Sequence, residues 1–206
     1  EQFILYLEWD ALRATIAQRF YFKNEEVGLT PAAELRSFNS SDLLASVGGK
    51  LSEAWSFDSG YQYNRRLTRT ERFNAAMRYS PELAKVINLG YRFTRDTLEH
   101  LDLSTQWPIG GRWTGLARWN YTLRDKRLLE GLAGVEYNAG CWAARFVMHR
   151  FVSATQEYIN AMFFQIELNG VSRIGSNPLE LLRQNVTGYV KTNEPPPAER
   201  NPFPVY

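Results

Sequence analysis

Residues 112–123 read RWTGLARWNYTL, and this stretch decides the fold class of the chain. Its alternate positions are apolar or aromatic: Trp113, Gly115, Ala117, Trp119, Tyr121 and Leu123. The positions between them are mostly polar and include Arg112 and Arg118. Successive strand side chains point to opposite faces, so the stretch predicts a β-strand with one apolar and one polar face. Large rings near the ends of the apolar face are typical of a membrane-spanning β-barrel, with lipid outside and a polar lumen inside.

Turn signals divide most of the chain into similar segments. The later turns recur about every 13–16 residues, a longer step than the ~8–12 residues usual in β-sandwiches. We expect about eleven strands, at residues 3–9, 11–23, 41–51, 55–64, 69–80, 85–94, 100–108, 112–123, 127–138, 141–152 and 157–169. The predicted fold class is therefore all-β, an antiparallel transmembrane β-barrel that occupies residues 1–170.

Proline marks the end of the predicted barrel. Six of the nine prolines begin at Pro178, and strands exclude proline because it lacks the N–H donor. This proline distribution predicts that residues 171–206 form an irregular C-terminal tail on the periplasmic side. Within it, Asn177 and Pro178 could begin a short helix, and Pro195–Pro197 favours an extended linker.

Tryptophans gather beside the tight turns of the predicted sheet. The five that lie near such turns are Trp9, Trp55, Trp107, Trp113 and Trp142. Amphipathic rings prefer a membrane–water interface, so we interpret them as a periplasmic aromatic girdle. Only Trp119 lies away from that edge. An aromatic-rich soluble barrel is the alternative.

Composition argues against several functional classes. The chain has 206 residues, a net charge of +2 and a mean hydropathy of −0.39. This charge balance favours no nucleic-acid partner, and no apolar run reaches the ~18 residues of a membrane helix. His100 and His149 have no metal-ligand spacing, and a hydrolase that pairs Ser104 with His100 is less favoured than ordinary barrel polar groups. We expect no enzyme, metal or cofactor. Because the chain starts at Glu1 without methionine, we expect a fragment or a processed chain.

Alternation also assigns polar side chains to the lumen. The predicted lumen-facing residues are Arg112, Arg118, Arg145 and His149. The single cysteine, Cys141, shares the register of Arg145 and lies at the tight-turn edge, which places it at the periplasmic mouth. It is either a buried small hydrophobe or half of a disulfide whose partner lies outside this chain, since the periplasm is oxidising.

Several phrases of the sequence resemble one protein family. Residues 111–152, GRWTGLARWNYTLRDKRLLEGLAGVEYNAGCWAARFVMHRFV, and residues 163–189, FFQIELNGVSRIGSNPLELLRQNVTGY, strongly resemble the C-terminal barrel region of the LptD family. Residues 79–93 and 101–113 fit as well. Members of this family assemble lipopolysaccharide in the outer membrane of Gram-negative bacteria. The resemblance runs from about residue 42 to 189, with looser agreement before it.

The resemblance implies the last strands of a larger barrel. The family combines a periplasmic domain with a closed barrel of about 26 strands, near the upper end of the bacterial range. A lipoprotein plug of the LptE type occupies the lumen, and periplasmic bridge proteins deliver lipopolysaccharide. Members often carry two adjacent cysteines that bond to the periplasmic domain; here Gly140 and Cys141 stand at those positions. A lateral gate separates the first and last strands, which implies gate residues Ala161, Phe163, Phe164, Gln165 and Ile166 in this chain. Residues 157–169 also alternate poorly, since their apolar residues fall on both faces, and apolar side chains on both sides suit a passing acyl chain. An ordinary closing strand is the alternative.

The resulting hypothesis is lipopolysaccharide transport through the lumen and a lateral gate into the outer leaflet. Arginines of the predicted outer loops could contact its phosphates, because guanidinium forks suit phosphate oxygens: Arg65, Arg66, Arg124 and Arg127. A solvated rim, with these arginines paired to Asp96, Asp125 and Glu130, is the plainer interpretation. A porin-type channel is the alternative function, although a porin needs neither a periplasmic cysteine nor a long tail. A soluble ligand-binding barrel is the third class.

Overall fold

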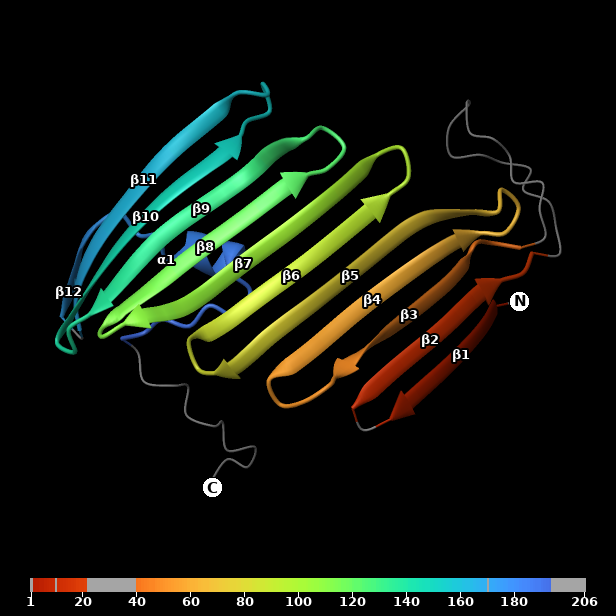
Figure 1. Cartoon of the computed structure of the whole chain (residues 1–206), viewed down its shortest axis with the longest axis horizontal. Coiled ribbons are helices and arrows are strands. Elements are labelled where there is room, and N and C mark those ends of the chain that lie inside the picture. Colours follow the sequence, from red (N-terminus) through yellow and green to blue (C-terminus); the bar gives the residue numbers. More distant parts are fainter. Residues whose placement is uncertain (1, 10, 22–39, 170, 194–206) are drawn as a thin grey trace. The chain divides into compact units, whose positions relative to one another are not determined.

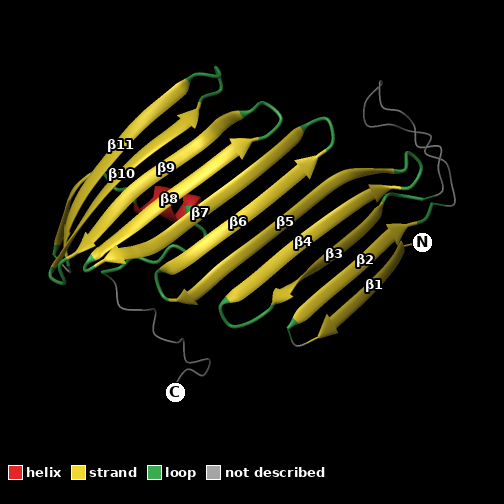
Figure 2. Ribbon diagram, in the orientation of Figure 1, coloured by secondary structure: helices red, strands yellow, loops and turns green. Residues whose placement is uncertain are grey.

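The computed structural model describes residues 2–9, 11–21, 40–169 and 171–193, with residues 2, 3, 8 and 9 described by their backbone only. Most of these residues form strands, as Figure 2 shows. The elements are β1 (Gln2–Trp9), β2 (Leu12–Arg19), β3 (Leu43–Lys50), β4 (Trp55–Asn64), β5 (Arg69–Glu82), β6 (Lys85–Thr94), β7 (Leu98–Gly110), β8 (Trp113–Thr122), β9 (Arg127–Asn138), β10 (Trp142–Val152), β11 (Tyr158–Leu168), β12 (Ser172–Gly175) and α1 (Leu179–Asn185). Within these ranges, no helix is long and apolar enough to cross a membrane.

The strands follow one another in a 12-stranded sheet, in the order β1 to β12 (Figure 1). The predicted all-β antiparallel fold class is confirmed, and the observed strands lie close to the predicted ranges. β2 ends at Arg19, earlier than predicted, and nearly all of the segment between the predicted strands 11–23 and 41–51 lies outside the described residues. β1 and β12 are the two end strands of this order.

Two compact units make up the chain. The first comprises Glu1–Met77 and Gly90–His100, and the second comprises Arg78–Leu89 and Leu101–Tyr206. In the first unit, β1 pairs with β2 from Gln2↔Arg19 to Trp9↔Leu12. β3 pairs with β2 and, from Leu43↔Tyr63 to Lys50↔Ser56, with β4.

In the second unit the hairpins are tight, as the turn residues predict. Gly110 and Gly111 join β7 to β8 with φ of 136° and 56°, a conformation that glycine adopts without steric cost. β8 pairs with β9 across a register shift at Asn120/Tyr121. β10 pairs with β9 and, along its whole length, with β11. This unit therefore presents one continuous ladder from β8 to β11.

The two faces of that ladder differ in burial, with a period of two. We call the buried side the covered face; its residues include Thr114, Leu116, Leu132, Ala143, Arg145, Val147, His149, Gln165 and Glu167. We call the other side the open face; its exposed residues include Trp113, Trp119, Phe146, Met148, Met162 and Phe164. The alternation predicted for residues 112–123 thus holds, with the aromatic side exposed and the polar side buried.

The tail covers the covered face. α1 lies against these strands (Figure 1), and Leu179, Leu182 and Val186 pack with Leu116, Leu132 and Val147 in one apolar cluster. The predicted short helix exists and begins at Leu179, with Pro178 as its N-cap residue. Asn177 Oδ1 accepts the Leu179 N–H at 3.3 Å.

The sheet also continues beyond the predicted barrel boundary at residue 170. β12 pairs with β11 from Gln165↔Gly175 to Leu168↔Ser172. The strand predicted to be the last one, residues 157–169, therefore has a short neighbour on part of its far edge. The division into a barrel at 1–170 and a tail at 171–206 stays a prediction, and the tripeptide Pro195–Pro197 lies outside the described residues.

Candidate functional site

A buried charge cluster occupies the covered face near the tight-turn end of β9, β10 and β11. Arg145 is its centre, with a side chain that is 0% exposed. Its guanidinium donates to Glu136 at 3.1 Å and to Glu167 at 2.7 Å, and also to Gln165 Oε1 at 3.0 Å. Each carboxylate comes from a strand next to β10, because the antiparallel register sets Arg145 opposite Glu136 and Gln165. A buried guanidinium with two carboxylates is stable only when most of its hydrogen bonds are satisfied. Here both Nη atoms have partners, whereas Nε is buried without one among the described residues.

Residues 186–193, which we call the strap, supply further partners to this cluster. Lys191 Nζ lies 2.8 Å from Glu167 Oε1, and Tyr189 Oη donates to Glu136 Oε2 at 3.0 Å. Thr192 Oγ1 donates to Glu136, and Arg145 donates to Asn193 Oδ1. Burial raises the pKa of Tyr189, so its hydroxyl stays protonated and donates to the carboxylate. The strap and the strands therefore share one polar network.

The strap also binds the sheet through its backbone. The side-chain amide of Gln106 on β7 donates to the Val190 carbonyl at 2.7 Å and accepts the Val190 N–H at 2.9 Å. Asn138 Nδ2 donates to the Thr192 carbonyl at 2.7 Å, and Asn88 Nδ2 donates to the Thr187 carbonyl at 2.9 Å. Side-chain amides thus satisfy a backbone that runs across the strands and cannot join their ladder.

A second polar group lies around Glu130 on β9. Arg118 Nη1 lies 3.1 Å from Glu130 Oε2, and His149 Nε2 lies 2.8 Å from Glu130 Oε1. Arg118 also pairs with Asp102 at 2.6 Å and donates to Asn185 in the last turn of α1. The structure therefore brings together two of the predicted lumen-facing residues and places Arg145 on the same face.

The fourth predicted lumen residue, Arg112, lies elsewhere. It is exposed in the β7–β8 turn, and Nη1 donates to the Ala139 carbonyl at 3.2 Å. Cys141 is an exposed free thiol just before β10, in a turn held by Asn169, whose N–H donates to the Cys141 carbonyl at 3.0 Å. Of the two alternatives for a lone cysteine, exposure argues against a buried hydrophobe. Its disulfide stays a prediction.

Two of the tryptophans predicted to form a girdle, Trp113 and Trp142, lie on the open face. Trp113, Tyr137 and Trp142 form a row at the tight-turn end of β8, β9 and β10, with ring centroids 4.8 Å and 5.3 Å apart. Trp107 stacks on Tyr79 at 6.3 Å. Trp55 is exposed, and the side chain of Trp9 lies outside the description.

The predicted gate strand corresponds to β11. Its apolar residues on both sides suggested poor alternation, but the burial pattern alternates along its second half. Phe164 and Ile166 belong to the open-face register, whereas Phe163 packs against the apolar cluster beneath α1 and Gln165 joins the charge cluster. Ala161 shares the register of Phe163 and is half-buried. The apolar residue on the covered side is therefore explained by the tail.

The four candidate phosphate contacts fall in different units. Arg65 and Arg66 are exposed in the β4–β5 turn of the first unit. Arg124 is exposed in the β8–β9 turn of the second, and Arg127 donates to Gln156 from the start of β9. Glu130, one acid of the plainer rim interpretation, instead binds Arg118 and His149.

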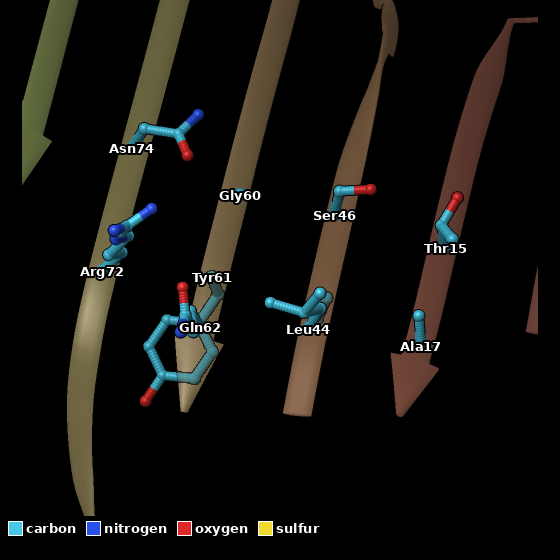
Figure 3. A pocket seen from close by; sticks show the side chains of 10 residues that line it. Thr15, Ala17, Leu44, Ser46, Gly60, Tyr61, Gln62, Arg72 and Asn74 are labelled. Atoms are coloured by element: carbon cyan, nitrogen blue, oxygen red, sulfur yellow. The ribbon is translucent and has the colours of Figure 1, made fainter. Parts of the chain in front are cut away.

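The first unit carries an open groove on one face of its sheet. Neighbouring strands line it with small and polar side chains and with one leucine, seen in Figure 3: Thr15, Ala17, Leu44, Ser46, Gly60, Gln62, Arg72 and Asn74. Its volume is about 370 Å³. Gly60 leaves room for Asn74, since a Cβ there would lie 2.5 Å from Asn74 Oδ1. Amide, hydroxyl and guanidinium groups in an open groove can hydrogen-bond a hydrated, sugar-like chain.

Sequence reasoning missed most partners of the predicted residues. Glu136 and Glu167 lie at buried positions of β9 and β11, and their alternation with apolar neighbours could have assigned them to the same face as Arg145. The tail also contained a detectable pattern. Its apolar residues recur every three or four positions, as on one face of a helix, and so predict burial of that face: Leu179, Leu182, Val186 and Tyr189.

Comparison with known proteins identifies the family. The family model described as "LptD: LPS transport system D" matches residues 7–113, about half of the chain. The chain belongs to the LptD family.

LptD proteins named "LPS-assembly protein LptD" resemble the chain over most of its length. The protein of Aromatoleum aromaticum is 48% identical over 186 residues, which are 90% of this chain and 24% of that protein. The Thiobacillus denitrificans protein is 45% identical, with 90% and 25% covered. That of Nitrosomonas europaea is 44% identical, with 89% and 25% covered. The chain thus spans about a quarter of these LptD relatives, and the resemblance in its strands and tail is confirmed.

Proposed function

We propose that this chain is the C-terminal strand region of an outer-membrane barrel that assembles lipopolysaccharide in the outer leaflet. The observation that carries the proposal is the contrast between the two faces of β8–β11. The open face is apolar and edged by Trp113, Tyr137 and Trp142, which suits lipid. The covered face holds buried charges that only protein or water can satisfy, which suits a lumen.

Lipopolysaccharide combines several acyl chains with a hydrated, phosphorylated sugar chain, so the two parts need different routes. The sugars would pass along polar lumenal surfaces such as the groove beside Gln62, Arg72 and Asn74. The acyl chains would leave between β11 and the first strand of the barrel, at Ala161, Phe163, Phe164, Gln165 and Ile166. No bond breaks in this process, so the proposed protein is a transporter and no enzyme.

The partners in this proposal complete the barrel and supply its cargo. Relatives are about four times longer than the chain, so the missing strands lie in the rest of the protein. A lipoprotein plug of the LptE type would occupy the remaining lumen, and periplasmic bridge proteins would deliver lipopolysaccharide. Cys141, exposed at the tight-turn edge, would bond to the periplasmic domain. Arg65, Arg66, Arg124 and Arg127 would meet phosphates at the outer rim.

Photocrosslinking in the full-length protein tests the route of the sugars. A photoreactive amino acid at Gln62, on the groove, should capture lipopolysaccharide only while newly made lipopolysaccharide is supplied. The matched control is Val47 on β3, which is 41% exposed and does not line the groove. It should capture lipid regardless of supply. Absence of any supply-dependent adduct at Gln62, with normal protein levels, would contradict transport along this face.

A further inference from the structure

The two halves of β11 are held very differently on their far edge. β12 pairs with Gln165–Leu168. Next to it, the Ser176 N–H donates to the Phe164 carbonyl, and the Phe164 N–H donates to Ser176 Oγ, both at 2.9 Å. Among the described strands, none pairs with that edge at residues 158–163. We call residues 158–163 the free half and residues 165–168 the pinned half.

The covered face repeats this asymmetry. In the pinned half, Gln165 is 1% and Glu167 is 6% exposed, and both belong to the charge cluster of Arg145. Lys191 of the strap adds a second cation to Glu167 at 2.8 Å. In the free half, the covered-face positions are uncharged: Ile159 is exposed, and Ala161 and Phe163 are half-buried. Moving the pinned half would separate buried opposite charges, whereas moving the free half would break hydrogen bonds with a neighbouring strand and the packing of Phe163 against the apolar cluster, without separating a buried ion pair.

We propose that the strap and β12 form a clamp that confines opening of the barrel seam to residues 158–163 of β11, with a hinge at Phe164–Gln165. This inference rests on the proposed function, in which β11 borders the seam. Strand β12 covers the pinned half from the side, and Lys191 and Arg145 hold it from the covered face. The pinned half keeps the tight-turn end of the seam closed. Acyl chains leave only beside the free half, where Met162 is 68% exposed.

Two disulfide locks in the full-length protein test the clamp. One joins Asn160→Cys to the position on the first barrel strand that crosslinks to it best, and the other joins Ser172→Cys on β12 to its own best partner there. Single-cysteine variants control for mispairing with Cys141. The Asn160 lock should lower lipopolysaccharide export at least about fivefold, with recovery on reduction, and the Ser172 lock should change it less than about twofold.

The outcomes of the two locks separate the clamp from the proposed function. If the Ser172 lock blocks export as strongly as the Asn160 lock, the whole seam moves and the clamp is wrong, while the lateral exit stands. If neither lock changes export although both form, the exit lies elsewhere, and both proposals fall.

Hydrogen exchange of the full-length protein gives a second readout without export. Amides of the pinned half should exchange at least about tenfold more slowly than those of the free half. Lys191→Met should speed exchange of the pinned half and leave the free half unchanged. Glu180→Gln, on the exposed side of α1, is the matched control and should change neither. Equal exchange of the two halves in the wild-type protein would overturn the clamp.

Discussion

Arg145→Met should strongly destabilise the folded barrel. The substitution keeps most of the side-chain volume but removes the cation that Glu136 and Glu167 share. Both carboxylates stay buried, since their side chains are 0% and 7% exposed. Removing one partner of a buried ion pair costs about 3–5 kcal/mol, because the remaining charge has lost both water and its partner. We expect a loss in that range for the free energy of unfolding.

The structure also predicts which second substitution rescues the first. Glu167 keeps Lys191 at 2.8 Å after Arg145 is lost, whereas Glu136 keeps only the neutral donors Tyr189 and Thr192. Arg145→Met with Glu136→Gln should therefore recover more stability than Arg145→Met with Glu167→Gln. The second pair instead leaves Lys191 without its carboxylate. A difference of roughly 1–3 kcal/mol between the double variants follows from the cost of one unpaired buried group.

Urea unfolding of the full-length protein in detergent, followed by its heat-modifiable gel mobility, measures these differences. Arg112→Met is the matched control, since Arg112 is exposed with one hydrogen bond to a backbone carbonyl, and its effect should stay within about 0.5 kcal/mol. Equal midpoints for Arg145→Met and Arg112→Met would refute a buried cluster. Equal rescue by the two double variants would refute the assigned role of Lys191.

Further predictions concern the faces, the thiol and the outer rim. Val47→Arg should impair assembly of folded barrel far more than Ser46→Arg, because arginine on a lipid face costs ~2–4 kcal/mol near the bilayer midplane; equal yields would contradict the face assignment. Cys141→Ser should change the non-reducing gel mobility of the full-length protein and leave the reducing mobility unchanged, whereas a free, alkylatable thiol in the wild type would contradict the disulfide. Reversing charge at Arg124 and Arg127 together should raise outer-membrane permeability to large antibiotics, and an unchanged barrier at normal protein levels would favour a merely solvated rim.

The comparison of Ser46 with Val47 illustrates what the strand pattern can predict. Alternation assigns Thr114 to the polar side of its strand, as it does Ser46, but Thr114 is 8% exposed because the tail covers that part of β8. Ser46, in contrast, lies in an open groove. The pattern assigns a residue to a face of its strand, whereas what lies against that face depends on segments far away in the chain.

β11 makes the same distinction. Its mixture of apolar residues suggested a strand with apolar side chains on both sides for a passing acyl chain. The structure instead pairs Phe163 with the cluster beneath α1 and Gln165 with Arg145. The strand itself was predictable, but its neighbours on the covered face come from residues 179–193, which sequence reasoning treated as a separate tail.

The sequence by itself determined the strands, their two faces and the family, because a period of two and short turns are local properties of the chain. Only the tertiary structure decided the partners of the buried charges. Arg145 meets Glu136 because two strands pair in one register, and Lys191 meets Glu167 because the strap crosses the sheet. Such contacts bring together residues that are far apart in the chain, at the cost of loop closure. They also bury charges, and the cost of removing a charge from water depends on every group packed around it.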